Sequence, residues 1–327
     1  MDLPIRPRRN RKSAGVRALV RETSLSPGDF ILPLFLHAGA ADEPIESMPG
    51  CTRWSLEGLV KEAGEALALG IPGVVLFPAI DDSLKTAGAE ESFNAEGLIP
   101  QAIQALKSAH PELVVMTDIA LDPYNSDGHD GLVVEGEIIN DETVRVLCHQ
   151  AVCHAEAGAD IVSPSDMMDG RVAELRDALD EHGHEKVSIC SYTAKYASAY
   201  YGPFRGALGS APKAGDKKTY QMDPANRREA VRELLLDEEE GADIVMVKPA
   251  GPYLDIISEL RDHTALPMAA YQVSGEYLMI KSASKDGWID EEKVMMESLM
   301  GIKRAGADII LTYFAKDAAR LLTQQTR

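Results

Sequence analysis

Short, largely apolar runs alternate with helix-like patterns along the whole chain. Such runs are typical of parallel strands, which are buried on both faces of a sheet. The eight strand candidates are Phe30–Leu36, Gly73–Phe77, Leu113–Asp118, Asp160–Ser163, Val187–Ser191, Asp243–Lys248, Pro267–Gln272 and Asp308–Tyr313. Helical segments fall between them, for example Leu56–Leu69, Asp141–Ala157 (with Asp141 as its expected cap) and Arg227–Glu240. Eight strand–helix units predict an α/β protein with a closed TIM (β/α)8 barrel.

A repeated motif supports this architecture. Three segments share a glycine followed by Ala-Asp-Ile: HAEAGADIVSPSD at 154–166, DEEEGADIVMVKP at 237–249 and IKRAGADIILTYF at 302–314. The glycines suit the left-handed residue that ends a helix, and they are Gly158, Gly241 and Gly306. The seventh residues beyond them are Ser165, Lys248 and Tyr313. These three should occupy equivalent positions at the carboxyl ends of strands, the rim where TIM barrels place their chemistry.

The charge balance narrows the range of partners. The chain has 327 residues and a formal net charge of −19 at pH 7. A strongly acidic protein is a poor ligand for nucleic acid or an anionic membrane, so neither is expected as a partner. No stretch is apolar for long enough to span a bilayer.

The basic residues of the first segment stand out against this acidic body. The segment contains Arg6, Arg8, Arg9, Arg11, Lys12, Arg17 and Arg21. It has no apolar stretch behind it that would indicate a secretory signal. We therefore expect residues 1–28 to form an arm that packs on an acidic neighbouring subunit, and residues 29–327 to form a single catalytic barrel.

The cysteines indicate a reducing compartment. They are Cys51, Cys148, Cys153 and Cys190. On the predicted helix, His149 and Cys153 share a face and could supply two metal ligands, but nothing nearby completes a site. Reduced core thiols in a cytoplasmic protein are the preferred interpretation.

Two lysines stand at the ends of predicted neighbouring strands. Lys248 closes the apolar run VMVKP, and Lys195 follows the fifth strand. Burial lowers the pKa of a lysine, and a second ammonium lowers it further, which makes the amine able to attack a ketone and form an imine. The alternative is that each lysine extends its amine to solvent.

Other polar residues suggest how a substrate would be held. The long loop Tyr201–Gln221 carries Arg205, Lys213, Lys217 and Lys218 and is expected to be a lid. Its cations could hold one carboxylate, and the hydroxyls of Ser274 and Tyr313 another. A second long loop, Leu121–Asp141, follows the third strand.

Acidic residues gather at the end of that third strand. They are Asp118, Asp122, Asp127 and Asp130, with His129 among them. They suit a hard cation or proton transfer, although Asp and Gly are also common in solvated turns. On the fourth loop, Ser165 and Asp166 could orient a substrate amine. Glu233, on a helix, is either a solvated residue or a cation site.

At these positions the chain closely resembles the porphobilinogen synthase (5-aminolevulinate dehydratase) family, from about Arg6 to the C-terminus. The most specific blocks are SPSDMMDGR at 163–171, AKYASAYYGPFR at 194–205, YQMDPANRREA at 220–230, MVKPAGPYLDI at 246–256, YQVSGEY at 271–277 and KRAGADIILTYFA at 303–315. Several long blocks in the same order are far more specific than one short motif.

The resemblance implies a lyase of tetrapyrrole (heme or chlorophyll) biosynthesis. It would condense two molecules of 5-aminolevulinic acid to porphobilinogen, with loss of two waters, through Schiff bases on Lys195 and Lys248 and without pyridoxal phosphate. The first substrate would bind Lys248, with its carboxylate on Ser274 and Tyr313. The second would bind Lys195, with its carboxylate on Arg205 and Lys217. The further positions implied around the substrates are Asp118, Ser165, Asp166 and Gln221.

The resemblance also carries expectations about metals and assembly. Zinc-dependent relatives have cysteines where this chain has Ala120, Asp122 and Asp130, so it resembles the aspartate-rich branch and no zinc is expected. Asp122 and Asp130 could instead hold Mg²⁺ or a monovalent cation. Glu233 matches an allosteric Mg²⁺ position between subunits, and a homo-octamer is implied. Lys217 stands where some relatives have arginine, which keeps the charge but loses the two-pronged geometry.

Alternative functions remain at this point. Another class I aldolase would need one essential lysine and commonly a phosphate site. A metal-dependent aldolase or hydrolase would instead use the acidic cluster after the third strand. An inactive scaffold is disfavoured because every lysine, hydroxyl and acid of the motifs is present.

Overall fold

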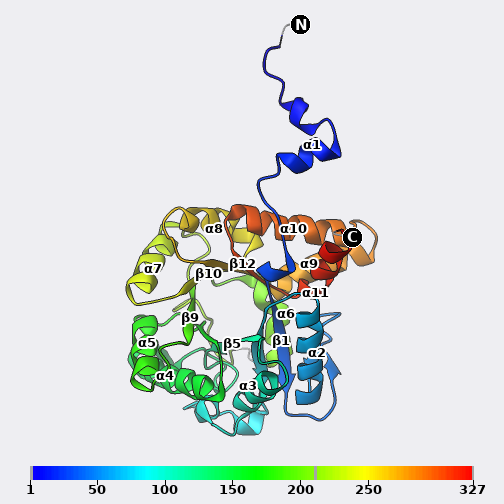
Figure 1. The fold of residues 1–327 in the computed structure, drawn as a ribbon. Helices are drawn as coiled ribbons and strands as arrows, with labels where there is room; N and C mark the ends of the chain where they lie inside the picture. Colours follow the sequence, from blue (N-terminus) through cyan, green and yellow to red (C-terminus); the bar gives the residue numbers. More distant parts are fainter. Residues whose placement is uncertain (1–2, 210–211, 326–327) are drawn as a thin grey trace.

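The computed structural model describes residues 3–209 and 212–325, and a closed parallel barrel is its centre (Figure 1). The barrel strands are β1 (Phe30–His37), β4 (Gly73–Ala79), β5 (Val114–Ile119), β8 (Ile161–Pro164), β9 (Ser188–Lys195), β10 (Ile244–Lys248), β11 (Met268–Gln272) and β12 (Ile309–Thr312). Each pairs in parallel with the next, and β12 returns to β1 through Phe30↔Ile310 and Ile31↔Leu311. The predicted TIM barrel and all its strands are confirmed.

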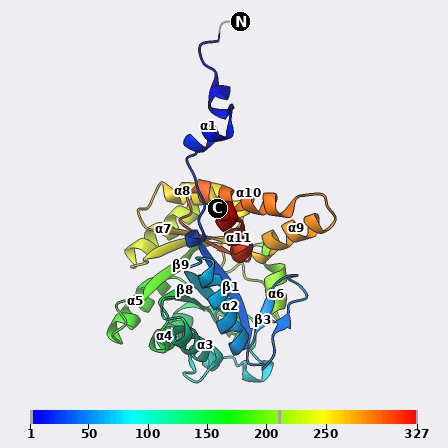
Figure 2. The same cartoon turned by 45° about the vertical axis from the view of Figure 1, so that its right-hand side comes forward.

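Helices surround the barrel (Figures 1 and 2). They are α2 (Leu56–Ala68), α3 (Leu98–Ala109), α4 (Asn140–Ala157), α5 (Arg171–Glu181), α7 (Arg228–Glu239), α8 (Leu254–Arg261), α9 (Ser274–Lys285), α10 (Glu291–Ala305) and α11 (Ala315–Gln325). The expected cap of α4 is wrong: its N-cap is Ile139, the last residue of a hairpin, and Asp141 lies in the first turn. An acid there still favours the helix dipole.

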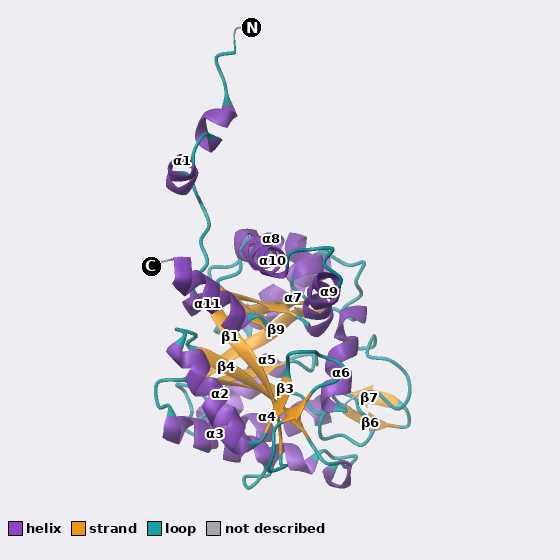
Figure 3. Ribbon diagram, turned by 90° about the vertical axis from the view of Figure 1, so that its right-hand side faces the viewer, coloured by secondary structure: helices purple, strands orange, loops and turns teal. Residues whose placement is uncertain are grey.

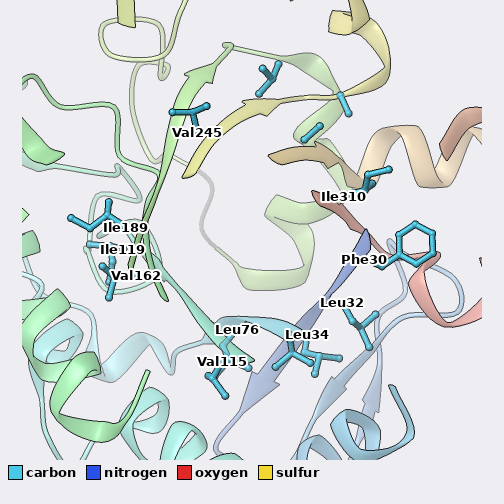
Figure 4. Close-up of a cluster of buried hydrophobic side chains, with 14 of the residues drawn as sticks. Phe30, Leu32, Leu34, Leu76, Val115, Ile119, Val162, Ile189, Val245 and Ile310 are labelled. Atoms are coloured by element: carbon cyan, nitrogen blue, oxygen red, sulfur yellow. The ribbon is translucent and has the colours of Figure 1, made fainter. Parts of the chain in front are cut away.

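The apolar core has two parts because alternate strand residues face opposite sides of the barrel wall. One cluster contains residues such as Leu34, Leu76 and Val115, and Figure 4 shows part of it around the ring of strands. A second cluster includes Phe35, Met116 and other buried side chains from the same strands. The barrel is therefore filled, and its chemistry is confined to the strand ends.

The long loops contain structure that the sequence patterns do not indicate. After β5, the strands β6 (Leu132–Val134) and β7 (Glu137–Ile139) form an antiparallel hairpin beside the barrel (Figure 3). After β9, the predicted lid begins with a short helix, α6 (Gly202–Leu208). Two residues of that loop, 210 and 211, lie outside the described part of the chain. After β1, the short strands β2 (Glu43–Pro44) and β3 (Thr52–Trp54) extend the sheet beside β1.

The first residues extend away from the barrel as an arm (Figures 1 to 3). The arm carries a 3-10 turn at Pro7–Arg11 and the short helix α1 (Ala14–Leu19), neither of which has a buried residue. Ile5 and Leu19 expose 81% and 87% of their surface, so the arm makes no apolar packing with its own barrel there. Among the described residues, no helix is both long and apolar enough to cross a membrane.

Candidate active site

The two lysines meet at the carboxyl rim of the barrel. Lys195 ends β9, Lys248 ends β10, and the two residues are direct partners in the parallel ladder. The register between these strands shifts: Ser191 pairs with Val245, and Ala194 with Val247. Three residues of β9 thus span two of β10, which is a β-bulge. The bulge brings Lys195 level with Lys248.

Aromatic rings surround the Lys248 amine. Its Nζ lies 4.5 Å from the ring centre of Tyr271, 4.9 Å from that of Tyr192, and 5.3 Å from that of Phe204. The Tyr201 ring lies 5.4 Å away. Burial in this setting, aided by the charge of Lys195, lowers the pKa of Lys248 to about 7. A substantial fraction of this amine is therefore uncharged at neutral pH, as a nucleophile must be.

Lys195 has polar neighbours instead. Its Nζ donates a short hydrogen bond to the carbonyl oxygen of Ser165 and lies 3.6 Å from Oδ1 of Asp130. Asp118, near the end of β5, faces the same space, and its removal from water raises its pKa to about 6 against the opposing charges of both lysines. A carboxyl group with such a pKa can take up or release a proton near neutral pH.

Lys217 from the lid lies between two carboxylates. Its Nζ is 3.2 Å from Oδ2 of Asp122 and 2.9 Å from Oδ2 of Asp130. All three side chains are at least nine-tenths buried. Burial alone would raise the pKa of Asp130, but the charges of Lys195 and Lys217 outweigh it and hold that pKa well below its usual range. An ammonium group therefore occupies the position in which the sequence suggested a metal cation.

His129 holds the lid through two hydrogen bonds. Its Nε2 lies 2.9 Å from the carbonyl oxygen of Ala214, and its Nδ1 lies 3.1 Å from the hydroxyl of Tyr220. A carbonyl only accepts, so Nε2 carries the proton and Nδ1 accepts one from Tyr220. The peptide N–H of Asp130 also donates to the Tyr220 hydroxyl, at 3.3 Å. Both ends of residues 214–220 are thus tied to the segment that follows β5.

These groups enclose a cavity of about 30 Å³. Its lining is Asp118, Asp122, Asp130, Ser165, Lys195, Tyr201, Phe204, Arg205, Lys217, Gln221 and Lys248. Most of the residues that the sequence singled out therefore lie together. Across the described part of the chain, no carboxylate lies within ion-pairing distance of Arg205. The buried Oε1 of Gln221 also lacks a hydrogen-bond donor there. Both groups are free to bind a ligand in this cavity.

Ser274 and Tyr313 lie near this cavity but are not part of its lining. The Ser274 hydroxyl accepts a hydrogen bond from the N–H of Phe204 at 3.1 Å and donates to the carbonyl of Tyr200 at 3.3 Å. The hydroxyls of Tyr313 and Tyr271 are 3.0 Å apart. Both hydroxyls are thus held against the aromatic residues around Lys248.

Asp166 does not line the cavity that holds the two lysines. Its Oδ2 lies 3.7 Å from Nε of the buried Arg171, and its Oδ1 accepts the N–H of Met168 at 2.7 Å. Arg171 in turn lies 3.6 Å from Asp237 on α7. Asp166 thus lies next to the cavity, because its neighbour Ser165 lines it. The carboxylate of Asp166, however, belongs to a buried ionic network with Arg171 and Asp237.

Glu233 lies elsewhere, on α7, in a groove of about 1010 Å³ that the β6–β7 hairpin also lines. Burial raises the pKa of Glu233 to about 7, and the charges of Asp237, Asp169 and Glu229 add to this effect against Arg171. In residues 3–209 and 212–325, no cluster of three or more His, Cys, Asp or Glu side chains is arranged to hold a metal ion. His149 contacts the Phe93 ring, and the four cysteines are free thiols.

The sequence patterns missed two groups of site residues. One is the aromatic surround of Lys248, namely Tyr192, Tyr201, Phe204 and Tyr271. The other is the lid fastening by His129 and Tyr220. The density of aromatic residues in SYTAKYASAYYGPF, directly around Lys195, was the one available signal for the first group.

Fold and site together define a class: a TIM-barrel enzyme with two amines buried side by side at the carboxyl rim. The family model for delta-aminolevulinic acid dehydratase matches residues 4–321. The chloroplastic enzyme of that name from Physcomitrium patens is 60% identical over 98% of this chain and 74% of its own length. The Glycine max enzyme is 62% identical over 98% and 79%, respectively. The solved Toxoplasma gondii ME49 enzyme, in complex with its product porphobilinogen, superimposes with a TM-score of 0.98 at 53% identity, covering 98% of this chain and 92% of that one.

The chain belongs to the delta-aminolevulinic acid dehydratase (porphobilinogen synthase) family. It is a lyase with the activity of that family, the formation of porphobilinogen from 5-aminolevulinic acid in porphyrin biosynthesis. The expected cytoplasmic location is wrong, because these plant relatives are named chloroplastic and point to a plastid. Charge and free thiols do not separate one reducing compartment from another, which is why the sequence patterns misled on this point.

Proposed function

We propose that the reaction runs through imines of two 5-aminolevulinic acid molecules, one on Lys248 and one on Lys195. The observation that carries this proposal is the cross-strand pairing of the two lysines above one cavity, with the pKa of Lys248 near 7. Each amine attacks a substrate ketone carbon, and loss of one water leaves a carbon–nitrogen double bond. The protonated imine withdraws electrons from the adjacent carbon, so carbon–carbon bond formation needs no pyridoxal cofactor.

The two lysines have different surroundings, which supports different roles. Burial among the aromatic residues lowers the pKa of Lys248, so that a substantial fraction of its amine is uncharged at neutral pH and ready to attack first. Ser274 and Tyr313 lie beside those rings and would receive the carboxylate of that first substrate. Around Lys195 the cavity presents Arg205 and Lys217, whose charges suit the carboxylate of the second substrate.

Asp118, Ser165 and Gln221 complete the lining of the cavity and would contact the amino groups of the two substrates. The raised pKa of Asp118 suits the proton transfers that imine formation and ring closure require. The product complex of the Toxoplasma gondii relative supports porphobilinogen as the ligand of this cavity. Asp166 would act on the site through its buried network with Arg171.

Substrate entry requires the lid to move. A cavity of about 30 Å³ is close to the volume of one water molecule, and 5-aminolevulinic acid is much larger. The groups that close the cavity on the lid side are Lys217 and Gln221. Release of Lys217 from Asp122 and Asp130 would both open the cavity and free its charge for a substrate carboxylate.

Metal requirements follow from the donor groups. Glu233 fits a hydrated Mg²⁺, because a dication would offset both the burial of its charge and the repulsion from the neighbouring acids Asp237 and Asp169. Such an ion would stabilise the groove and act on the site from a distance. Asp122 and Asp130 do not fit an active-site cation in this arrangement, because the ammonium groups of Lys217 and Lys195 already pair with them. No cysteine lines the cavity, so a thiolate zinc site is not expected.

The arm supports a homo-oligomer, for which we propose the octamer that the family resemblance implies. The arm is rich in arginine and lysine, whereas the chain as a whole carries a net charge of −19. The apolar residues Ile5 and Leu19 of the arm are exposed. A second copy of the barrel would bury these residues and pair the charges. Sedimentation of the full chain, compared with a chain that lacks residues 1–28, measures this directly. A mass unchanged by the deletion would argue against an assembly built on the arm.

Borohydride trapping tests the reaction itself. The protein is mixed with 5-aminolevulinic acid, reduced with borohydride, and analysed by intact mass and peptide mapping. We expect adducts on Lys248 and, at higher substrate concentration, on Lys195 as well. A protein that makes porphobilinogen but carries no lysine adduct would refute the imine mechanism.

A further inference from the structure

The carboxylate of Glu276 connects the segments that follow β10 and β11. The residue pairs of that ladder end at Val247↔Ala270, before Lys248 is reached. Beyond it, Oε1 of Glu276 accepts the N–H of Gly251 at 2.7 Å, and Oε2 accepts the N–H of Val273 at 2.8 Å. One side chain therefore bridges the backbone just after Lys248 and the backbone just before Ser274.

The environment of Glu276 is unusual for a carboxylate. The residue exposes only 8% of its surface. In the described part of the chain no lysine or arginine forms an ion pair with it, and its hydrogen-bond donors are backbone groups. Burial of a charge without a counter-charge is costly, and here it raises the pKa of Glu276 to about 7. Helix capping at Val273 alone would not require the second bond to Gly251.

The backbone is shaped to admit this bridge. A Cβ atom on Gly251 would lie 2.5 Å from Oε1 of Glu276, so a larger residue there would displace this carboxylate from its hydrogen bond. On the other side, a Cβ on Gly275 would lie 2.5 Å from the carbonyl oxygen of Tyr200. The start of α9 is thus packed tightly between the turn after Lys248 and the segment that leads into α6.

We propose that Glu276 is a positioning residue that sets the distance between the Lys248 amine and the Ser274 hydroxyl. It acts by holding Gly251, three residues after Lys248, and Val273, which directly precedes Ser274. The proposal rests on the function proposed above, in which the first substrate spans these two groups with its ketone and its carboxylate. Ser274 also binds the N–H of Phe204, so a shift of α9 would disturb the aromatic surround of Lys248 as well.

The substitution Glu276→Gln tests this role while keeping the size of the side chain. The amide has one acceptor atom in place of two, and its NH₂ group faces a backbone N–H. We expect the fraction of Lys248 trapped with 5-aminolevulinic acid and borohydride to fall about tenfold at limiting substrate, because a buried hydrogen bond to a charged group is lost. Trapping at Lys195, measured in a parallel sample at saturating substrate, should fall less. The measured quantity is therefore the ratio of the two adducts.

A matched control is Glu291, the first residue of α10, which contacts the other end of α9. Glu291 pairs with Lys281 and Ser284 of α9, at 2.6 and 2.8 Å, so Glu291→Gln loosens α9 without touching its first turn. This variant should lower the melting temperature and leave the adduct ratio of the wild type unchanged. If Glu276→Gln does not fold, Glu276→Asp replaces it, since the shorter carboxylate keeps its charge but does not span both N–H groups.

The outcomes separate this inference from the proposed function. A wild-type adduct ratio in a folded Glu276 variant would overturn the positioning role. So would an equal loss of both adducts that Glu291→Gln reproduces, because that result describes a structural role only. Absence of a Lys248 adduct in the wild-type protein would instead refute the imine mechanism. A selective loss at Lys248 supports the inference.

Discussion

Lys195 is the direct ladder partner of Lys248 because β9 contains one more residue than β10 over the same length. Without that bulge, the residue level with Lys248 would come one position earlier in β9. The bulge also lets Tyr192 and Lys195, three residues apart, approach the same interior space, where the lysine Nζ lies 5.8 Å from the tyrosine ring centre. Regular alternation would turn residues at that spacing to opposite faces.

The lowered pKa of Lys248 predicts the pH dependence of its trapping. The amine is uncharged above about pH 7 and protonated below it, so adduct formation should rise through pH 7 and level off above it. Between pH 7 and the ordinary lysine value of 10.5, the unfolded chain binds the extra proton, so this group makes folding more favourable as pH rises in that window. Single-turnover trapping at several pH values measures the midpoint. A midpoint near 10 would contradict the effect of burial.

Removal of the Lys248 amine should abolish turnover without unfolding the barrel. We expect Lys248→Ala to lose porphobilinogen formation by at least about a thousandfold, since covalent catalysis has no substitute in the cavity. Circular dichroism and the melting temperature should remain close to wild type. Lys285→Ala, on the exposed end of α9, is the control and should retain full activity. Substantial turnover by Lys248→Ala would refute the role of this lysine.

Loss of the Lys217 charge should affect both stability and substrate binding. Lys217→Met would leave Asp122 buried without an ammonium partner and Asp130 with only the more distant Lys195. Breaking a buried ion pair in this way costs roughly 3–5 kcal/mol, to be read from urea unfolding curves. The KM for 5-aminolevulinic acid should also rise. Lys217→Arg keeps the charge and serves as the control; equal stability of the two variants would show that the pairing contributes little.

The fastening of the lid by His129 can be tested by proteolysis. His129→Phe keeps a planar ring but removes the hydrogen bonds to Ala214 and Tyr220. We expect trypsin to cut after Lys213, Lys217 or Lys218 several times faster in this variant. His182→Phe, at an exposed position on α5's end, should leave the cleavage rate unchanged. Equal cleavage in all three proteins would mean that His129 does not restrain the lid.

The response to Mg²⁺ should depend on Glu233. Glu233→Gln removes the acidic group whose pKa is raised by burial and by its acidic neighbours. We expect basal porphobilinogen formation to persist and stimulation by added Mg²⁺ to be lost. Glu239→Gln, exposed on the same helix, should respond as the wild type does. An unchanged response of Glu233→Gln would remove this residue from any magnesium site.

The sequence was sufficient for the barrel and for most of the cavity. Apolar runs and the repeated Gly-Ala-Asp-Ile segments located the strands, and the rim position of Lys248 followed from them. Contacts between distant segments could not be predicted in this way. The pairing of Lys217 with Asp122 and Asp130 depends on how two long loops fold over each other, which local periodicity does not encode.

The pairing register between β9 and β10 was a second feature that the sequence patterns did not predict. The bulge in β9 leaves no periodic signal in a strand that is buried on both faces. The bridge by Glu276 was hidden for a similar reason, because its partners Gly251 and Val273 belong to two different strand ends. A carboxylate near the start of a helix reads as an ordinary cap until its second partner is seen.

The closure of β12 against β1 has a consequence for the synthesis of the protein. Phe30 and Ile310 become neighbours only after the chain has been synthesised as far as β12. Until then the amino-terminal part of β1, which β3 does not cover, lacks its partner strand, and Tyr313 is missing from the rim. Growing chains therefore carry an unpaired, apolar strand end at β1 until β12 is made, which is the condition under which chains need chaperones to avoid aggregation.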